Sequence, residues 1–236
     1  MLNTCKYLVA PWLLVITFSL PAAAETDAAG EFVSLFDGQT LEGWEGDPRF
    51  WRVKDGAIVA QTTETNRPRG NTFLIWTGGE VQDFELKLRY RIDSPWANSG
   101  IQIRSEHLGD FVVRGYQLDI ATDDWITGIF YEERGRGALA RRGQRLVIAA
   151  DGSRQVERFA DEDALAEHYD QSEWTEYHVV ARGSHFVTRI NGHKMHEVVD
   201  DGPAARQRGI LAVQLHAGGL MTMRVKDIQL KTLATP

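Results

Sequence analysis

The stretch Phe84–Ile92 constrains the fold more than any other part of the chain. Apolar and charged residues alternate there over nine positions without a slip, which is the pattern of a β-strand with one buried and one solvated face. Shorter runs with this period cover 100–104, 116–120, 177–181, 186–190, 210–215 and 221–230. Turn signals such as Asn191-Gly192 separate them. Many short strands with little helix predict an all-β sandwich of two antiparallel sheets.

Three further segments carry local expectations. Asn191-Gly192 between two strand-like runs predicts a β-hairpin, and the acidic segment 161–169 is the one candidate helix. The segment Arg134–Arg145 holds five arginines among glycines. We interpret it as a solvated loop, because no aromatic residues are interleaved to stack on bases. Three histidines in turn-like or charged surroundings are expected at the surface: His107, His193 and His196.

Residues 1–24 read as a signal peptide. A short basic start precedes an apolar run over 7–20 and the small residues Ala22-Ala23-Ala24. The apolar run falls short of the ~20 residues needed to span a bilayer, so we expect cleavage after Ala24 and a periplasmic or secreted bacterial protein with no membrane contact. The remaining residues 25–236 are expected to form a single domain. With 26 Lys+Arg against 33 Asp+Glu, the charge disfavours a nucleic-acid partner.

Three of the predicted strands place similar polar pairs on the face away from the core. The pairs are Gln102 with Arg104, Gln117 with Asp119, and Gln214 with His216. A merely solvated face would instead carry Lys, Glu, Thr and Ser, as the polar side of Phe84–Ile92 largely does. Amides donate and accept hydrogen bonds, which suits sugar hydroxyls. We therefore predict a carbohydrate-binding groove on these strands.

His216 is the candidate for proton transfer, since histidine titrates near neutrality without help. Tyr131 and Glu133 share one strand parity and are preferred for the groove over Glu132. Tryptophans at 76, 96 and 125 lie near turns, where one could stack on a sugar ring. The sequence lacks zinc-site, serine-hydrolase and phosphate-loop patterns. A hard-cation site built from Asp119, Glu133 and His216 stays open.

About ten short motifs in one order over residues 32–233 carry a family resemblance. They include Leu35-Phe36-Asp37-Gly38, Trp51-Arg52-Val53, Asn71-Thr72-Phe73-Leu74, Asp83-Phe84-Glu85-Leu86, Asn98-Ser99-Gly100-Ile101-Gln102-Ile103-Arg104, Gly115-Tyr116-Gln117, Ile190-Asn191-Gly192 and Gln214-Leu215-His216. Taken together, these motifs resemble the 3-keto-disaccharide hydrolase family. The resemblance implies a concanavalin A-like sandwich, or jelly roll, that carries a site on one sheet. It also implies cleavage of glycosides whose glucose ring bears a ketone at carbon 3.

A ketone at carbon 3 acidifies the proton on carbon 2, so a base can start a β-elimination that expels the group on carbon 1. With that substrate, we expect His216 to act as base and Asp119 or Glu133 as acid. Arg104 with Gln102 or Gln117 would lie near the enolate oxygen, while Tyr131 and Gln214 would bind the sugar. The resemblance leaves room for a divalent cation as electrophile and implies no organic cofactor. The alternatives are a lectin-like carbohydrate-binding sandwich, then a two-carboxylate glycosidase.

Overall fold

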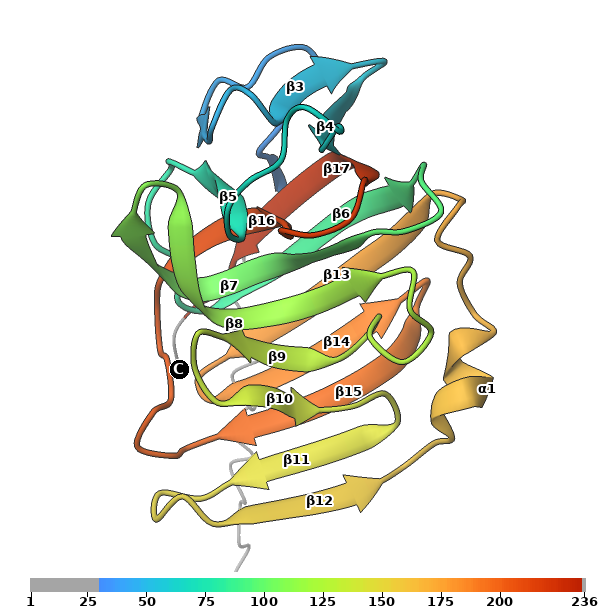
Figure 1. Cartoon of the computed structure of the whole chain (residues 1–236). Helices are drawn as coiled ribbons and strands as arrows, with labels where there is room; N and C mark the ends of the chain where they lie inside the picture. Colours follow the sequence, from blue (N-terminus) through green and yellow to red (C-terminus); the bar gives the residue numbers. More distant parts are fainter. Residues whose placement is uncertain (1–29, 235–236) are drawn as a thin grey trace, which may run out of the picture.

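A computed structural model describes residues 30–234 of the chain. These residues form two β-sheets that face each other, with one short helix at the side (Figure 1). The leader predicted over residues 1–24 lies outside the described residues. In the described part, no helix is long and apolar enough to cross a membrane.

The larger sheet has ten strands, which are β1 (Val33–Ser34), β3 (Trp51–Lys54), β4 (Ala57–Gln61), β6 (Phe84–Ile92), β11 (Gln144–Ile148), β12 (Arg154–Arg158), β13 (Thr175–Arg182), β14 (His185–Ile190), β15 (His193–Asp200) and β17 (Thr222–Thr232). The smaller sheet has seven, which are β2 (Trp44–Glu45), β5 (Thr72–Trp76), β7 (Asn98–Gly109), β8 (Val112–Ala121), β9 (Phe130–Glu133), β10 (Gly137–Ala140) and β16 (Ile210–Leu215). Among these strands only β11 and β15 pair in parallel. The predicted all-β sandwich is confirmed.

The strand order of the smaller sheet places the predicted polar pairs side by side. Its order is β10-β9-β8-β7-β16-β5-β2. The strands β8, β7 and β16, which carry the three pairs, are therefore direct neighbours near the middle of the sheet. Gly100 of β7 lies opposite Asp119 of β8, and Gln102 lies opposite Gln117.

The core lies between the sheets and follows from the alternation of the sequence. In β6 the residues Phe84, Leu86, Leu88, Tyr90 and Ile92 are buried, while the charged residues between them are more exposed. Further along the interface, three aromatic rings from the two sheets meet with centroids 5.0–5.2 Å apart. They belong to Tyr116, Phe130 and Phe186. Such buried aromatic contacts are large contributors to the stability of a sandwich.

The predicted hairpin and helix are both present. Asn191 and Gly192 have φ values of 48° and 82° and join β14 to β15. Positive φ at both central residues is what a tight two-residue hairpin turn needs. The helix α1 (Glu162–Ala166) is shorter than the predicted 161–169. Asp161 caps it by accepting hydrogen bonds from the backbone N–H groups of Asp163 and Ala164.

The interpretation of Arg134–Arg145 as a solvated loop is wrong. The segment contains β10 and the start of β11. Arg142 is buried, and its guanidinium donates to the carbonyl oxygens of Thr127 (2.6 Å) and Glu162 (3.0 Å). Arginine can be buried in this way because its fork of donors matches several oxygens at once.

The expectation that His196 lies at the surface is also wrong, whereas His107 and His193 are exposed as expected. His196 is fully buried, and its Nδ1 lies 2.8 Å from the carbonyl oxygen of Gly128. The register of β14 and β15 shifts between Thr188 and Arg189, so Met195 and His196 are both buried. A simple alternation cannot predict this. Burial lowers the pKa of His196 to about 4.

Candidate functional site

A pocket of about 290 Å³ opens on the smaller sheet, on the face turned away from the larger sheet. Its lining is largely polar and comes from β8, β9, β16 and the ends and turns beside them. The lining residues are Asn71, Asn98, Gln117, Asp119, Trp125, Ile126, Tyr131, Glu133, Arg134, Gln214 and His216. Six of the eight residues predicted for the site are in this set.

A chain of amide hydrogen bonds forms the floor of the pocket. Gln117 Oε1 accepts from Gln102 Nε2 (2.5 Å) and from Gln214 Nε2 (2.9 Å). Gln117 Nε2 in turn donates to Asp119 Oδ1 (2.6 Å). Gln102 itself is fully buried and does not line the pocket. It therefore supports the floor from below and is not placed to contact a substrate, contrary to its predicted role.

Gly100 makes room for this arrangement. A Cβ atom at this position would come within 2.5 Å of Cγ of Gln117. The Gln117 side chain lies across the backbone of Gly100, where only glycine leaves space for it. The small residue on β7 therefore sets the position of the central amide on β8.

Asp119 and Glu133 bring two carboxyl groups to the same pocket. Asn71 Nδ2 (3.2 Å) and Gln214 Nε2 (3.4 Å) donate to Glu133. Burial raises the pKa of Asp119 to about 8; the hydrogen bond from Gln117 opposes this, and the charge of Glu133 adds to it. Asp119 therefore holds a proton at neutral pH. Because Oδ1 already accepts from Gln117, Oδ2 is the oxygen that carries this proton.

His216 and Gln214 line the pocket, and each has one buried polar atom without a partner. Nδ1 of His216 and Oε1 of Gln214 have no hydrogen-bond partner among the described residues. The imidazole of His216 lies edge-on to Trp96, with ring centroids 6.3 Å apart. Buried polar atoms without partners are uncommon in proteins. Two of them at one pocket favour a ligand that would satisfy them.

Strand β9 separates its two neighbouring glutamates as the parity argument predicts. Tyr131 and Glu133 line the pocket, whereas Glu132 is buried on the opposite face and pairs with Arg136. Burial raises the pKa of Tyr131, and the charges of Glu133 and Asp119 raise it further. Tyr131 is therefore a neutral hydroxyl donor at neutral pH.

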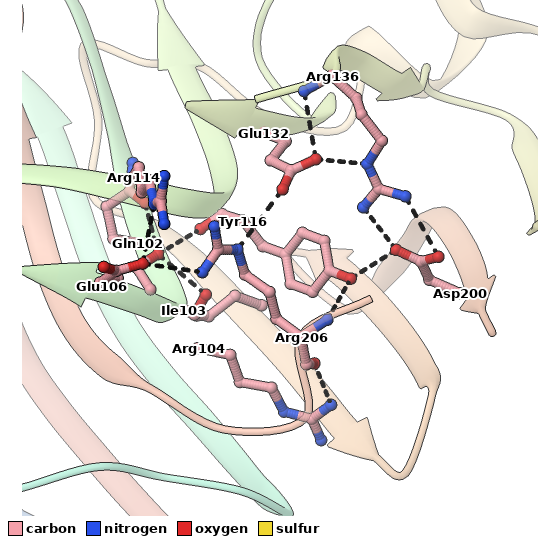
Figure 2. A network of polar contacts seen from close by, with 11 residues as sticks. Gln102, Ile103, Arg104, Glu106, Arg114, Tyr116, Glu132, Arg136, Asp200 and Arg206 are labelled. Carbon is pink, nitrogen blue, oxygen red and sulfur yellow. Dashed lines mark hydrogen bonds and ion pairs between the residues drawn. The ribbon is translucent and has the colours of Figure 1, made fainter. Parts of the chain in front are cut away.

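The prediction that Arg104 faces the groove is wrong. The register of β7 and β8 shifts between Ile103 and Glu106, and Arg104 has a left-handed backbone with φ of 44°. This bulge turns the side chain away from the pocket. Arg104 is fully buried, and its guanidinium contacts Asp83 (3.2 Å) and the carbonyl oxygens of Gln82, Gly183 and Arg206. Figure 2 shows the contact with Arg206.

Several lining residues were not predicted as site residues, and they come from strand ends and turns. Asn71 and Asn98 belong to motifs that the family resemblance used, so a signal for them existed. Trp125 was one of three candidate stacking tryptophans; its indole is 57% exposed at the pocket. Nothing in the sequence pattern distinguished Ile126 or Arg134.

The residues of the pocket do not form a preorganised metal site. Among the described residues, no three His, Cys, Asp or Glu side chains come together in a way that could hold a metal ion. The cation left open for Asp119, Glu133 and His216 does not fit this arrangement, and no chemical step is assigned to it.

Solved structures share the fold at low sequence identity. A carbohydrate-binding module of family 66 from Bacillus subtilis matches with a TM-score of 0.54 and 13% identity, over 82% of this chain and 97% of that one. A protein from Parabacteroides distasonis, provisionally named a glycosyl hydrolase, matches with a TM-score of 0.57 and 20% identity, over 86% and 100%. A galectin-like protein of unknown function from B. subtilis matches with a TM-score of 0.54 and 10% identity, over 83% and 92%.

These similarities establish the concanavalin A-like sandwich and leave the activity open, because the fold carries both binding proteins and enzymes. No curated protein matches the sequence. The family described as a 3-keto-alpha-glucoside-1,2-lyase-like domain, however, matches residues 31–231, which is most of the chain. The predicted resemblance is thereby confirmed, and the chain belongs to this family.

Proposed function

We propose that the protein is an exported enzyme that cleaves 3-keto-glycosides by β-elimination followed by addition of water. One pairing in the pocket carries this proposal. Asp119 is a buried carboxyl that keeps its proton at neutral pH, and His216 has an unpartnered inner nitrogen. An acid and a base of this kind are what the two halves of an elimination require.

In the elimination, His216 takes the proton from carbon 2 of the keto sugar. The electron pair of that C–H bond forms the double bond between carbons 1 and 2, and the C1–O bond breaks. Asp119 gives its proton to the departing oxygen. Water then adds to carbon 1, returning a proton to Asp119, while the protonated His216 returns its proton to carbon 2. The net reaction consumes one water and restores both residues.

Negative charge develops on the oxygen at carbon 3 during proton removal, and a donor must face it. Arg104 cannot supply this donor from its buried position. Asn98 lines the pocket, and its side-chain amide is bound to no other described residue. We assign this amide to the enolate oxygen. Tyr131 and Glu133 would hold the remaining sugar hydroxyls, and the buried Gln214 would keep Glu133 in place through its donated hydrogen bond.

The decisive experiment compares 3-keto-glucosides with their unoxidised parents, using protein that lacks residues 1–24. We expect release of the leaving group from the keto forms alone. His216→Ala and Asp119→Asn should each lower kcat by about 10²–10⁴-fold, the usual contribution of a general acid or base. Full activity of the His216→Ala variant would refute the assignment of the base. A parallel series with a chelator tests whether a cation takes part.

A lectin-like role is the second candidate, favoured by the exposed indole of Trp125 at the pocket rim. Binding of glucosides without cleavage of either form would support it. The two-carboxylate glycosidase comes third. Asp119 and Glu133 share a pocket, and cleavage of unoxidised glucosides would bring this mechanism forward.

A further inference from the structure

Arg134 occupies an unusual position at the rim of the pocket. It follows directly after β9 and is exposed, and it is the one lysine or arginine that lines the pocket. Its guanidinium forms no hydrogen bond or ion pair with any other described residue. Neighbouring Glu133 accepts instead from Asn71 and Gln214. A cation is therefore presented at the pocket with its donors free.

The backbone under Arg134 is strained and is held in place from below. Its φ of 54° lies in the left-handed region, which residues with a side chain adopt at a cost of about 1 kcal/mol or more. The turn is closed by the N–H groups of Gly135 and Arg136, which donate to Glu132 at 3.1 and 3.2 Å. Strain of this kind persists where the surrounding structure determines the conformation.

A buried network of polar contacts holds the turn in this conformation (Figure 2). Arg136 pairs with Glu132 and places Nη2 2.6 Å from Oδ2 of Asp200, which is itself buried. The hydroxyl of Tyr116 donates to the same Asp200 oxygen (2.5 Å). The turn that carries Arg134 is thereby tied to β8 and to the end of β15. Arg134 is presented from a fixed base, unlike an arginine on a free loop.

The position of Arg134 indicates which part of a substrate it meets. In the proposed reaction, the buried floor of Gln117, Asp119 and Gln214 would lie under the reacting sugar. A pocket of about 290 Å³ is smaller than most sites that enclose a drug-sized ligand. One sugar ring would fill it, and the leaving group would then project toward the rim. A guanidinium at the rim could bind a carboxylate with two parallel hydrogen bonds.

We propose that Arg134 is a specificity residue that selects glycosides whose leaving group carries a carboxylate. Because this inference rests on the proposed function, its test includes a binding measurement that needs no turnover. The probes are 4-carboxyphenyl glucoside and the corresponding carboxamide, which have nearly the same size and differ in charge. Binding of both unoxidised compounds is followed by calorimetry, and cleavage is measured on their 3-keto forms.

The wild-type protein should bind and cleave the carboxylate about tenfold better than the carboxamide, as expected for one partly exposed charge-assisted contact. Added salt should reduce this ratio. In Arg134→Gln the ratio should fall to about one, because only the carboxylate compound should be bound and cleaved less well. Arg134→Asn should lose the ratio as well without a lower Tm, because asparagine tolerates the left-handed backbone. This combination separates recognition from a structural role.

Arg208→Gln is the matched control, since it removes the same charge from an exposed arginine that pairs with Glu80 and lines a different cavity. It should leave the ratio unchanged. The inference is overturned if the wild type shows no preference, or if Arg134→Gln weakens both compounds equally. If neither keto form is cleaved but the binding preference depends on Arg134, the proposed function fails and the assignment of Arg134 stands.

Discussion

Asp119 is a residue whose burial serves the proposed chemistry and lowers the stability of the fold at high pH. Its pKa in the folded protein is about 8, against 3.8 for an ordinary aspartate. The folded state therefore keeps a proton that the unfolded state has already released between these values. This group leaves the free energy of unfolding undiminished below about pH 4. It lowers that free energy progressively as the pH rises toward 8.

Replacing Asp119 by asparagine should therefore stabilise the protein at high pH. The introduced amide can still accept the hydrogen bond from Gln117 and cannot ionise. We expect the free energies of unfolding of the two proteins to be close at pH 4 and to differ by several kcal/mol, at most about 6, in favour of Asp119→Asn at pH 9. Urea unfolding at both pH values measures this. A constant difference across the range would contradict the raised pKa.

The same ionisation should limit catalysis. Once Asp119 loses its proton it can no longer protonate the leaving oxygen, so kcat on a 3-keto-glucoside should fall as the pH rises through about 8. A pH–rate profile on a substrate with a poor leaving group shows this fall most clearly. A nitrophenyl leaving group, which needs little protonation, is the control and should show a weaker fall. Equal profiles for both substrates would argue against Asp119 as the acid.

At this scale, the sequence was informative where strands are regular. Alternation placed Gln117, Asp119, Gln214 and His216 on one face, and the structure brings all four to one pocket. Arg104 was misplaced by the same reasoning, because a bulge with a positive φ inverts the parity of its strand. An arginine is an uncommon residue in that conformation, so its identity did not predict the bulge.

At the level of single elements, β7 should tolerate little change at Gly100. An added Cβ would meet the side chain of Gln117 at 2.5 Å, and the overpacking should lower stability by about 1–3 kcal/mol. Displacing Gln117 also breaks its hydrogen bond to Asp119. The kcat of Gly100→Ala should therefore fall even where the variant is fully folded. Gly30→Ala is the control, since its Cβ meets nothing closer than 3.4 Å. Unchanged kcat in Gly100→Ala would separate Gln117 from the catalytic arrangement.

The turn between β9 and β10 offers a second test. Arg136→Gln would leave Asp200, which is 1% exposed, without its ion-pair partner. Breaking a buried pair from one side typically costs about 3 kcal/mol or more. Arg114→Gln removes a pair whose two side chains are each 47% exposed, and it should change stability by less than about 1 kcal/mol. Chemical unfolding of both variants provides the comparison, and equal effects would show that the buried pair of Arg136 and Asp200 contributes little.

The elements that could be predicted are those whose pattern is local. Strand β6 and the hairpin at Asn191-Gly192 follow from alternation and from turn chemistry, and both are confirmed. Strand β10 and the start of β11 were not predicted, because their segment is rich in arginine and glycine and shows no alternation. Arg136 and Arg142 find their partners on Asp200, Thr127 and Glu162, and only the folded chain brings these partners together.

For the whole molecule, the sandwich explains how a chain that cannot form an internal disulfide can remain stable. Its single cysteine is Cys5, which lies within the predicted leader, and two sheets with a continuous apolar interface replace the covalent support that small secreted domains use. The aromatic contacts between Tyr116, Phe130 and Phe186 belong to that interface. Stability should therefore be independent of reducing agents.

Export can be tested through the same cysteine. Cleavage after Ala24 removes the first 24 of 236 residues and leaves 212 with no thiol. Protein recovered from the periplasm of an expressing bacterium should therefore show the mass of the 212-residue chain and no reaction with a thiol reagent under denaturing conditions. A variant with Ala22 and Ala24 replaced by bulky residues should resist cleavage and show one thiol per chain. An intact leader and one thiol in the wild-type protein would refute the signal-peptide prediction, and with it the expected location.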